Sequence, residues 1–268
     1  MLVSRLKVVI LIIPIGIGFI ALGGWPYTLL VTALLAIAAW EYWRLFKSGG
    51  FTPSVHILVF GVVFLALSRA VWGFEYSGLI LTGLILLSMA YHTFRCEGGC
   101  PTPAVDFTIT LAGLLYIGWL GSYLISLRFL PQGLWWVLLT IPAIWIGDAG
   151  AYLIGKNFGK HKLAPRVSPN KTIEGYLGGL VFTTLGGLLL AFLWRLRFPE
   201  LTLLHGLVIG AALGVLAPLG DLGESMLKRQ FNVKDTSRII PGHGGILDRM
   251  DSWLWGAAIS FYLITGLW

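Results

Sequence analysis

The segment from Ser225 to Asp251 combines residue types that bind phosphates and metal ions. Its basic side chains are Lys228, Arg229, Lys234, Arg238 and Arg249, its carboxylates are Asp235, Asp248 and Asp251, and a glycine-rich turn runs Pro241-Gly242-His243-Gly244-Gly245. Only 12 of the 268 residues are acidic. Carboxylates gathered beside cations and glycines in so apolar a chain therefore predict a site for anionic phosphates and a divalent metal.

Helical spacing predicts two acidic faces around this segment. Residues at i, i+3 and i+4 share one face of a helix, which groups Asp221, Glu224, Ser225 and Lys228. The same rule pairs Asp248 with Asp251. These faces are expected to hold Mg²⁺, alone or with a second cation, with backbone N–H groups of the turn around Gly244 adding an anion-binding nest. The candidate metal ligands are Asp221, Asp248, Asp251 and Glu224.

Asp148 lies inside an apolar run, at residues 144–152. A lone carboxylate at such a position costs about 2.5 to 3.5 kcal/mol on insertion scales, so it requires a compensating partner. Small neighbours such as Gly147 and Gly150 let another helix or a ligand approach closely, which predicts a pocket wall. The alternative is a buried pair with a basic residue that serves packing alone.

Ser168 and Lys171 are hydroxyl and ammonium donors in a proline-containing loop that opens onto a predicted helix. Because a helix N-terminus favours anions, this arrangement predicts a phosphate contact. The alternative is a basic loop that touches lipid headgroups. Gly175 and Gly179, four residues apart, are interpreted as a helix-packing face.

The composition indicates an integral membrane protein and excludes an ordinary soluble domain. Hydrophobic residues make up 57% of the chain, charged residues 12%, and the mean hydropathy is +0.83. We predict an all-α, polytopic fold with about nine transmembrane helices. The apolar runs cover residues 8–23, 26–43, 55–72, 77–94, 105–127, 134–154, 175–194, 203–219 and 252–268, the first as a retained anchor, and a short extra helix is expected at 220–231.

The Lys and Arg distribution predicts the orientation. With the N-terminus inside and alternating spans, 15 basic residues fall on the inner side and 4 on the outer side. Both charged loops, at residues 156–171 and 228–249, then face the cytoplasm.

The ionisable residues divide the chain unevenly. Eight of the twelve acids lie beyond residue 139, so we expect a scaffold region at 1–139 and a catalytic region at 140–268 within one continuous membrane domain. The first half has few ionisable groups beyond Glu41, Arg69, Glu75 and Asp106, which are expected mostly near span ends, at the interface.

The motifs in the second half resemble those of the phosphatidate cytidylyltransferases, or CDP-diacylglycerol synthases. The resemblance covers about 105 residues, from Gly147 to Asp251, whereas the first half is similar only as a helical membrane region. The matching elements are Ser168-Pro169-x-Lys171-Thr172-x-Glu174-Gly175, Gly220-Asp221-x2-Glu224-Ser225 and Ser225-x2-Lys228-Arg229-x4-Lys234-Asp235-x5-Pro241-Gly242-His243-Gly244-Gly245-x2-Asp248-Arg249-x-Asp251.

This resemblance implies a dimeric enzyme of the bacterial-type inner membrane, with its active site on the cytoplasmic side. Such an enzyme joins CTP to phosphatidate and releases CDP-diacylglycerol and pyrophosphate. The partners expected are therefore CTP, phosphatidate, the lipid bilayer and a second copy of the chain, with no nucleic acid.

Elementary phosphate chemistry agrees with this reaction. A phosphate monoester is already nucleophilic at neutral pH, so the main obstacle is the repulsion between two polyanions, which a metal and cationic side chains offset. We assign catalysis to Asp221, Asp248, Asp251, Asp148 and Lys171, and substrate binding to Ser168, Lys228, Arg229, Lys234, Arg238, His243, Arg249 and Gly244. His243 either protonates the leaving pyrophosphate or, as we favour, braces the glycine turn.

Other function classes remain open from the sequence. A CTP-dependent polyprenol kinase, or another lipid enzyme that uses CTP, would share the nucleotide loop and differ in its acceptor. A CDP-alcohol phosphotransferase has three residues between its last two aspartates, where this chain has two, Arg249 and Met250. An ion-coupled transporter would explain Asp148 but not the charged loop.

Overall fold

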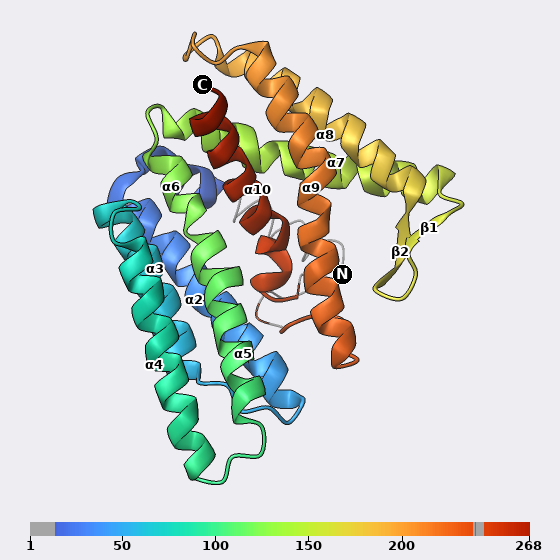
Figure 1. Ribbon diagram of the computed structural model, residues 1–268. Coiled ribbons are helices and arrows are strands. Elements are labelled where there is room, and N and C mark those ends of the chain that lie inside the picture. Colours follow the sequence, from blue (N-terminus) through green and yellow to red (C-terminus); the bar gives the residue numbers. More distant parts are fainter. Residues whose placement is uncertain (1–13, 238, 240–243) are drawn as a thin grey trace. The chain divides into compact units, whose positions relative to one another are not determined.

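A computed structural model describes residues 14–237, 239 and 244–268, and these residues form a helical protein (Figure 1). Among the described residues, seven segments are long and apolar enough to cross a membrane: Gly24–Ser48, Val55–Trp72, Ser77–Glu97, Pro103–Phe129, Gly133–Phe158, Ile173–Trp194 and Leu203–Gln230. They match seven of the predicted runs, and the run at 252–268 lies in a further helix, α10 (Leu247–Leu267). The first run reaches into residues outside those described. The predicted all-α membrane fold is confirmed.

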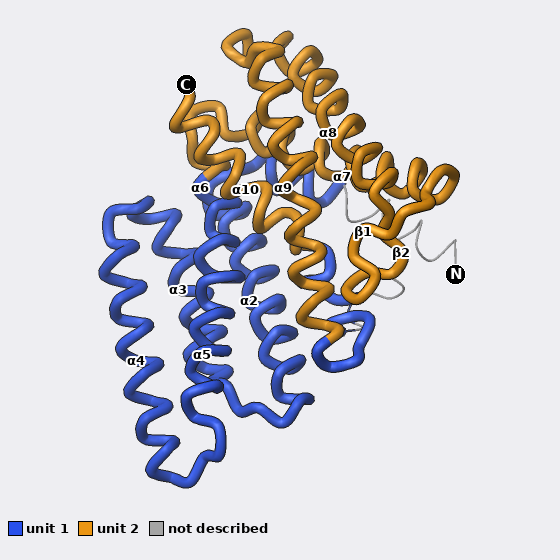
Figure 2. The backbone as a smooth tube through the Cα atoms, turned by 45° about the vertical axis from the view of Figure 1, so that its right-hand side comes forward, with its two compact units in different colours: residues 1–126, 230–249 blue, residues 127–229, 250–268 orange. Residues whose placement is uncertain are grey.

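The chain divides into two compact units, drawn in blue and orange in Figure 2. Unit 1 comprises residues 1–126 and 230–249, and unit 2 comprises residues 127–229 and 250–268. The segment 230–249 thus belongs with the N-terminal helices. These bounds differ from a division at residue 139, and the predicted split into scaffold and catalytic regions stays a prediction.

Unit 1 is built from helices that pack in chain order. They are α2 (Gly24–Ser48), α3 (Val55–Trp72), α4 (Ser77–Glu97), α5 (Pro103–Gly113) and the π-helical η1 (Leu114–Trp119), which leads into α6 (Tyr123–Phe129). Helix α2 packs on α3, α3 on η1, and α4 on α5. Two buried tyrosines on α2 add hydrogen bonds to the backbone of later segments. Tyr27 Oη donates to Leu124 O and Tyr42 Oη donates to Ile109 O, each over 3.1 Å.

Unit 2 contains three long helices, most of α10, and a hairpin. The helices are α7 (Gly133–Phe158), α8 (Ile173–Trp194) and α9 (Leu203–Gln230), and the antiparallel strands are β1 (Lys162–Ala164) and β2 (Ser168–Thr172). The sequence predicted a loop where the hairpin lies. Figure 1 shows this hairpin between α7 and α8. Thr172 caps α8, since its Oγ1 accepts a hydrogen bond from Gly175 N at 3.1 Å.

Small residues bring the helices of unit 2 into close contact. A Cβ on Gly147 of α7 would lie 1.9 Å from Thr183 Oγ1 of α8, and one on Gly187 of α8 would lie 2.4 Å from Gly206 O of α9. The predicted packing face is confirmed, because a Cβ on Gly179 would meet Ala151 at 3.0 Å.

Two expectations are wrong. The extra helix at 220–231 does not exist as a separate element, because α9 continues through Pro218 to Gln230. Arg69 and Asp106 do lie near span ends, in the last turn of α3 and the first turn of α5, but they are buried, at 3% and 0% exposure, and so is Glu41, at 0%, so these side chains are not exposed at an interface. Turns and loops supply much of the contact to these side chains, since the Arg69 guanidinium lies 3.6 Å from the Phe74 ring and Thr52 N donates to Asp106 Oδ1 at 2.7 Å.

Candidate functional site

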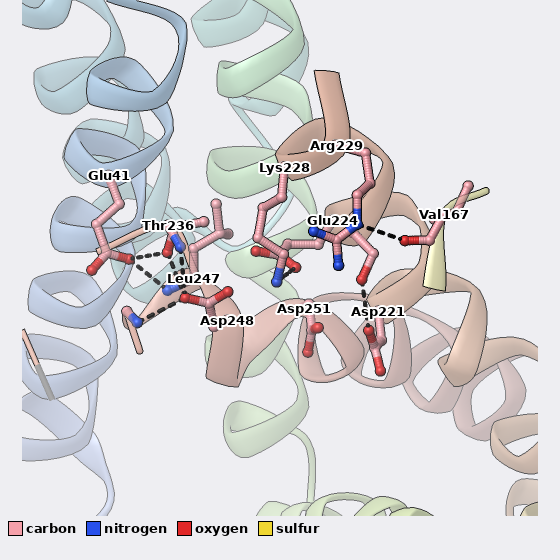
Figure 3. A network of polar contacts seen from close by, with 12 residues as sticks. Glu41, Val167, Asp221, Glu224, Lys228, Arg229, Thr236, Leu247, Asp248 and Asp251 are labelled. Carbon is pink, nitrogen blue, oxygen red and sulfur yellow. Dashed lines mark hydrogen bonds and ion pairs between the residues drawn. The ribbon is translucent and has the colours of Figure 1, made fainter. Parts of the chain in front are cut away.

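In unit 2, the hairpin places Lys171 against helix α9. Lys171 Nζ lies 2.7 Å from Asp221 Oδ2, and Ser225 Oγ donates to Asp221 Oδ1 over 3.3 Å. Asp221 and Ser225 share one helical face, as their spacing predicts. The hairpin itself is fixed at its turn, where Arg229 Nε donates to Val167 O at 3.0 Å (Figure 3).

A cavity of about 500 Å³ opens beside this ion pair. Asp148 of α7, Lys171 and Asp221 line it together with apolar residues such as Ile144 and Leu213. The prediction that Asp148 forms a pocket wall is confirmed. Because charged groups and aliphatic side chains share the same walls, the cavity suits a ligand with both a polyanionic and an apolar part.

Asp251 brings a third carboxylate to the same part of unit 2. Its side chain is buried, and Ser252 N donates to its Oδ1 at 2.6 Å. The backbones of α9 and α10 approach closely here, since a Cβ on Gly220, next to Asp221, would lie 2.6 Å from Asp251 O.

These carboxylates have the chemistry that a hard divalent cation requires. Mg²⁺ is commonly held by one or two protein carboxylates, with substrate phosphates and water completing its shell. Within the described part of the chain, no three Asp, Glu, His or Cys side chains converge on one point to ligate a metal. Asp221 of α9 and Asp251 of α10 supply two carboxylates in this part of unit 2, which is the donor type and number that Mg²⁺ commonly takes from a protein.

Glu224 and Lys228 are paired with each other on α9 (Figure 3). Glu224 is fully buried and Lys228 is 8% exposed. The sequence predicted metal binding for Glu224 and phosphate binding for Lys228. In the structure their mutual ion pair neutralises both charges, and the metal role of Glu224 and the phosphate role of Lys228 stay predictions.

In unit 1, Asp248 organises the turn ahead of α10. Its Oδ2 accepts three hydrogen bonds, from Thr236 N at 2.9 Å, Thr236 Oγ1 at 2.8 Å and Gly245 N at 2.7 Å. The bond to Gly245 reaches back three residues in the manner of a capping box. Gly244 has φ +82°, a conformation that favours glycine, and a Cβ there would lie 2.9 Å from Asp248 Oδ2.

Sequence reasoning missed Glu41 as part of this turn. Its carboxylate accepts hydrogen bonds from both sides of the motif segment, including Ser237 Oγ at 2.5 Å and Leu247 N at 2.8 Å. Figure 3 shows Glu41, Thr236 and Leu247 joined in this way. The available signal was an acid in the middle of an apolar run, the same signal that marked Asp148.

The remaining predicted residues are spread over both units. Lys234 lines a cavity of about 600 Å³ in unit 1 with Arg44, and Arg249 is exposed in the first turn of α10. Ser168 is half-buried at the start of β2. Arg238 and His243 lie outside the described residues.

The sequence is similar to known proteins along nearly its whole length. Residues 3–267 match the model of the cytidylyltransferase family. A phosphatidate cytidylyltransferase of Bacillus subtilis (strain 168) is 37% identical over 252 residues, which are 92% of this chain and 91% of the relative. The enzyme of that name from Synechocystis sp. (strain PCC 6803) is 30% identical over 97% of this chain and 96% of its own. A third, from Staphylococcus aureus (strain COL), is 42% identical over 65% of each chain.

Proposed function

The chain belongs to the cytidylyltransferase family, and from that premise we propose that it joins CTP to phosphatidate, giving CDP-diacylglycerol and pyrophosphate in phospholipid biosynthesis. The observation that carries the proposal is the cavity of unit 2. There Lys171 and Asp221 meet at 2.7 Å beside apolar side chains, which provides charged groups for phosphates and an apolar surface for a lipid.

The reaction needs its negative charges to be offset more than it needs a general base. An oxygen of the phosphatidate phosphate attacks the α-phosphorus of CTP, the new P–O bond forms, and the bond between the α-phosphorus and the bridging oxygen of pyrophosphate breaks. The attacking oxygen is already ionised at neutral pH. Catalysis then consists of holding two polyanions in line and offsetting their repulsion.

Asp221 and Asp251 are the residues that we propose to hold Mg²⁺ in unit 2, with Asp148 nearby. When bound, the ion would supply Lewis-acid stabilisation of the phosphate oxygens. Asp248, in the first turn of α10, is a further proposed ligand from the sequence. Substrate phosphates and water would supply the other oxygen ligands, as is usual for Mg²⁺.

Lys171 is proposed to move from carboxylate to phosphate when substrate binds. Its ammonium lines the cavity and now neutralises Asp221. If Asp221 held a cation, Lys171 would be available to donate to an anionic oxygen of CTP or phosphatidate. Lys234, Arg229 and Arg249 remain proposed phosphate contacts, as do Ser168 and Gly244, and so do Arg238 and His243 outside the described residues.

The chain is an integral membrane protein, and its bacterial relatives indicate the plasma membrane. We propose that both charged loops face the cytoplasm, where CTP is, because 15 basic residues fall on that side against 4 on the other. Assembly as a homodimer is proposed from the family resemblance alone.

The direct test uses purified protein with labelled CTP, phosphatidate and Mg²⁺. We expect labelled CDP-diacylglycerol and equimolar pyrophosphate, and loss of both products in excess chelator, because the proposed carboxylate site needs its cation. Thin-layer and ion-exchange chromatography separate the two. Polyprenol phosphate formed from polyprenol and CTP would indicate the kinase instead, and full activity in excess chelator would contradict the metal site.

The orientation can be tested with single cysteines in a background that lacks Cys96 and Cys100. Cysteines placed in the loops at 156–171 and 228–247 should resist an impermeant thiol reagent in intact cells and react after lysis, because the positive-inside rule puts both loops inside. A cysteine at Arg197, in the loop predicted outside, serves as the matched control. Labelling of both inner loops in intact cells would reverse the orientation.

A further inference from the structure

Glu41 holds both ends of the segment that contains the glycine-rich turn. All the groups concerned belong to unit 1. Glu41 Oε1 accepts from Ser237 Oγ at 2.5 Å and Ile246 N at 3.0 Å, and Oε2 accepts from Leu247 N at 2.8 Å. Thr236 Oγ1 lies 3.3 Å from Oε2. The carboxylate is fully buried on α2, so these protein groups take the place of water around it.

Two of these donors are the backbone N–H groups at the start of α10. Ile246 immediately precedes the helix and Leu247 is its first residue. The first N–H groups of a helix have no partner within the helix, and the positive end of its dipole favours an anion. Glu41 therefore caps α10 from another helix, 205 residues earlier in the chain.

Glu41 also explains a glycine of the motif. A Cβ at Gly245 would lie 2.3 Å from Thr236 Oγ1 and 2.6 Å from both carboxylate oxygens of Glu41. Only a residue without a side chain lets the backbone run between Glu41 and Asp248. Glu41 and Asp248 thus both contact the same turn, and the Thr236 hydroxyl lies within hydrogen-bond distance of each of them.

We propose that Glu41 is a positioning residue for the reaction, acting through the start of α10 and not on the substrates. This proposal rests on the proposed function. Helix α10 carries Asp248 and Asp251, and its direction at the first turn depends on which groups satisfy the N–H groups of Ile246 and Leu247. A small displacement of reacting groups, on the order of 1 Å, lowers a rate about a hundredfold even when the substituted residue is remote from the chemistry.

Glu41→Gln is the sharpest variant, because the amide cannot satisfy the same donors. Each carboxylate oxygen faces one backbone N–H, Ile246 N at Oε1 and Leu247 N at Oε2. Whichever way the amide is turned, its NH₂ group faces a backbone donor. Glu41→Asp keeps the charge but is one methylene shorter, and Glu75→Gln is the matched control, since Glu75 is an exposed glutamate of the same unit.

The experiment has a kinetic arm and a hydrogen-exchange arm. In the first, Glu41→Gln should lower kcat about a hundredfold while the KM values for CTP and phosphatidate stay within about threefold. Glu41→Asp should recover part of the loss, and Glu75→Gln should match wild type. In the second, measured without substrate or metal, amides of residues 245–248 should exchange faster in Glu41→Gln, with the amides of α3 and α4 unchanged.

The two arms separate the ways in which the proposal can fail. Wild-type kcat in Glu41→Gln would overturn it, and so would faster exchange throughout α3 and α4, which would mean a general loss of stability. If wild-type protein gave no CDP-diacylglycerol at all, the proposed function would fail. Exchange confined to residues 245–248 would then still support the placement of α10 by Glu41, because that arm requires no turnover.

Discussion

Asp221→Asn is expected to lower turnover about a thousandfold at saturating substrate. The substitution keeps the size of the side chain and removes the charge that we propose to hold Mg²⁺. Charge stabilisation by such a metal in the transition state amounts to several kcal/mol, and each 1.36 kcal/mol changes the rate about tenfold. Initial rates of CDP-diacylglycerol formation, measured against Mg²⁺ concentration, give the loss.

The ion-pair partner of Asp221 provides the internal comparison. Lys171→Ala should cost about 1.5 to 3 kcal/mol, the range for a hydrogen bond to a charged group, and should raise KM for CTP or phosphatidate more than it lowers kcat. Glu200→Gln changes an exposed acid of the same unit and should leave both constants unchanged. Detergent gel filtration checks that each variant is folded.

A different ranking would change the assignment. If Lys171→Ala lost as much turnover as Asp221→Asn, and the double variant lost no more, the ion pair would act as a structural unit. The 2.7 Å contact between Lys171 and Asp221 would then persist during the reaction, and substrate binding would not break it. Asp251 would become the leading metal ligand in unit 2.

The sequence predicts well what depends on local pattern. Apolar runs of about 20 residues can only be satisfied as helices in a bilayer, so the spans follow from composition. The contact between Asp221 and Ser225 follows from i, i+4 spacing, and the pocket role of Asp148 follows from the cost of its burial. In each case, the residues that decide the outcome are neighbours on one helix, or a single residue in an unusual setting.

What the sequence does not show depends on contacts between distant segments. Glu41 contacts Leu247, 206 residues further along the chain, and no local pattern connects the two. The hairpin Lys162–Thr172 was missed because its strands are only three and five residues long and contain two lysines and a proline, residue types that are uncommon in strands. Once folded, the same segment is what places Lys171 at Asp221.

Asp248→Asn should also lower turnover about a thousandfold. The geometry lets this variant distinguish the effect of the negative charge from the effect of the hydrogen bonds that Asp248 accepts from the turn. Three donors on Asp248 from the described residues, two of Thr236 and one of Gly245, converge on one oxygen, Oδ2. An asparagine can therefore keep these bonds by placing its amide oxygen there. The turn should stay folded, and a loss of kcat would report the missing negative charge, as expected for a metal ligand.

Thr236→Val tests the hydrogen bonds to the turn by themselves, because it removes a hydroxyl donor and leaves the Asp248 carboxylate in place. The Thr236 hydroxyl has one proton and lies nearer Asp248, at 2.8 Å, than Glu41, at 3.3 Å, so the lost bond is mainly the one to Asp248. A hydrogen bond to a charged group is worth about 1.5 to 3 kcal/mol, which predicts a fall in kcat of about ten- to a hundredfold, less than the loss expected for Asp248→Asn. Near-normal turnover in a folded Asp248→Asn protein, beside a larger loss in Thr236→Val, would instead make Asp248 a brace for the turn. The proposed metal site would then rest on Asp221 and Asp251 in unit 2.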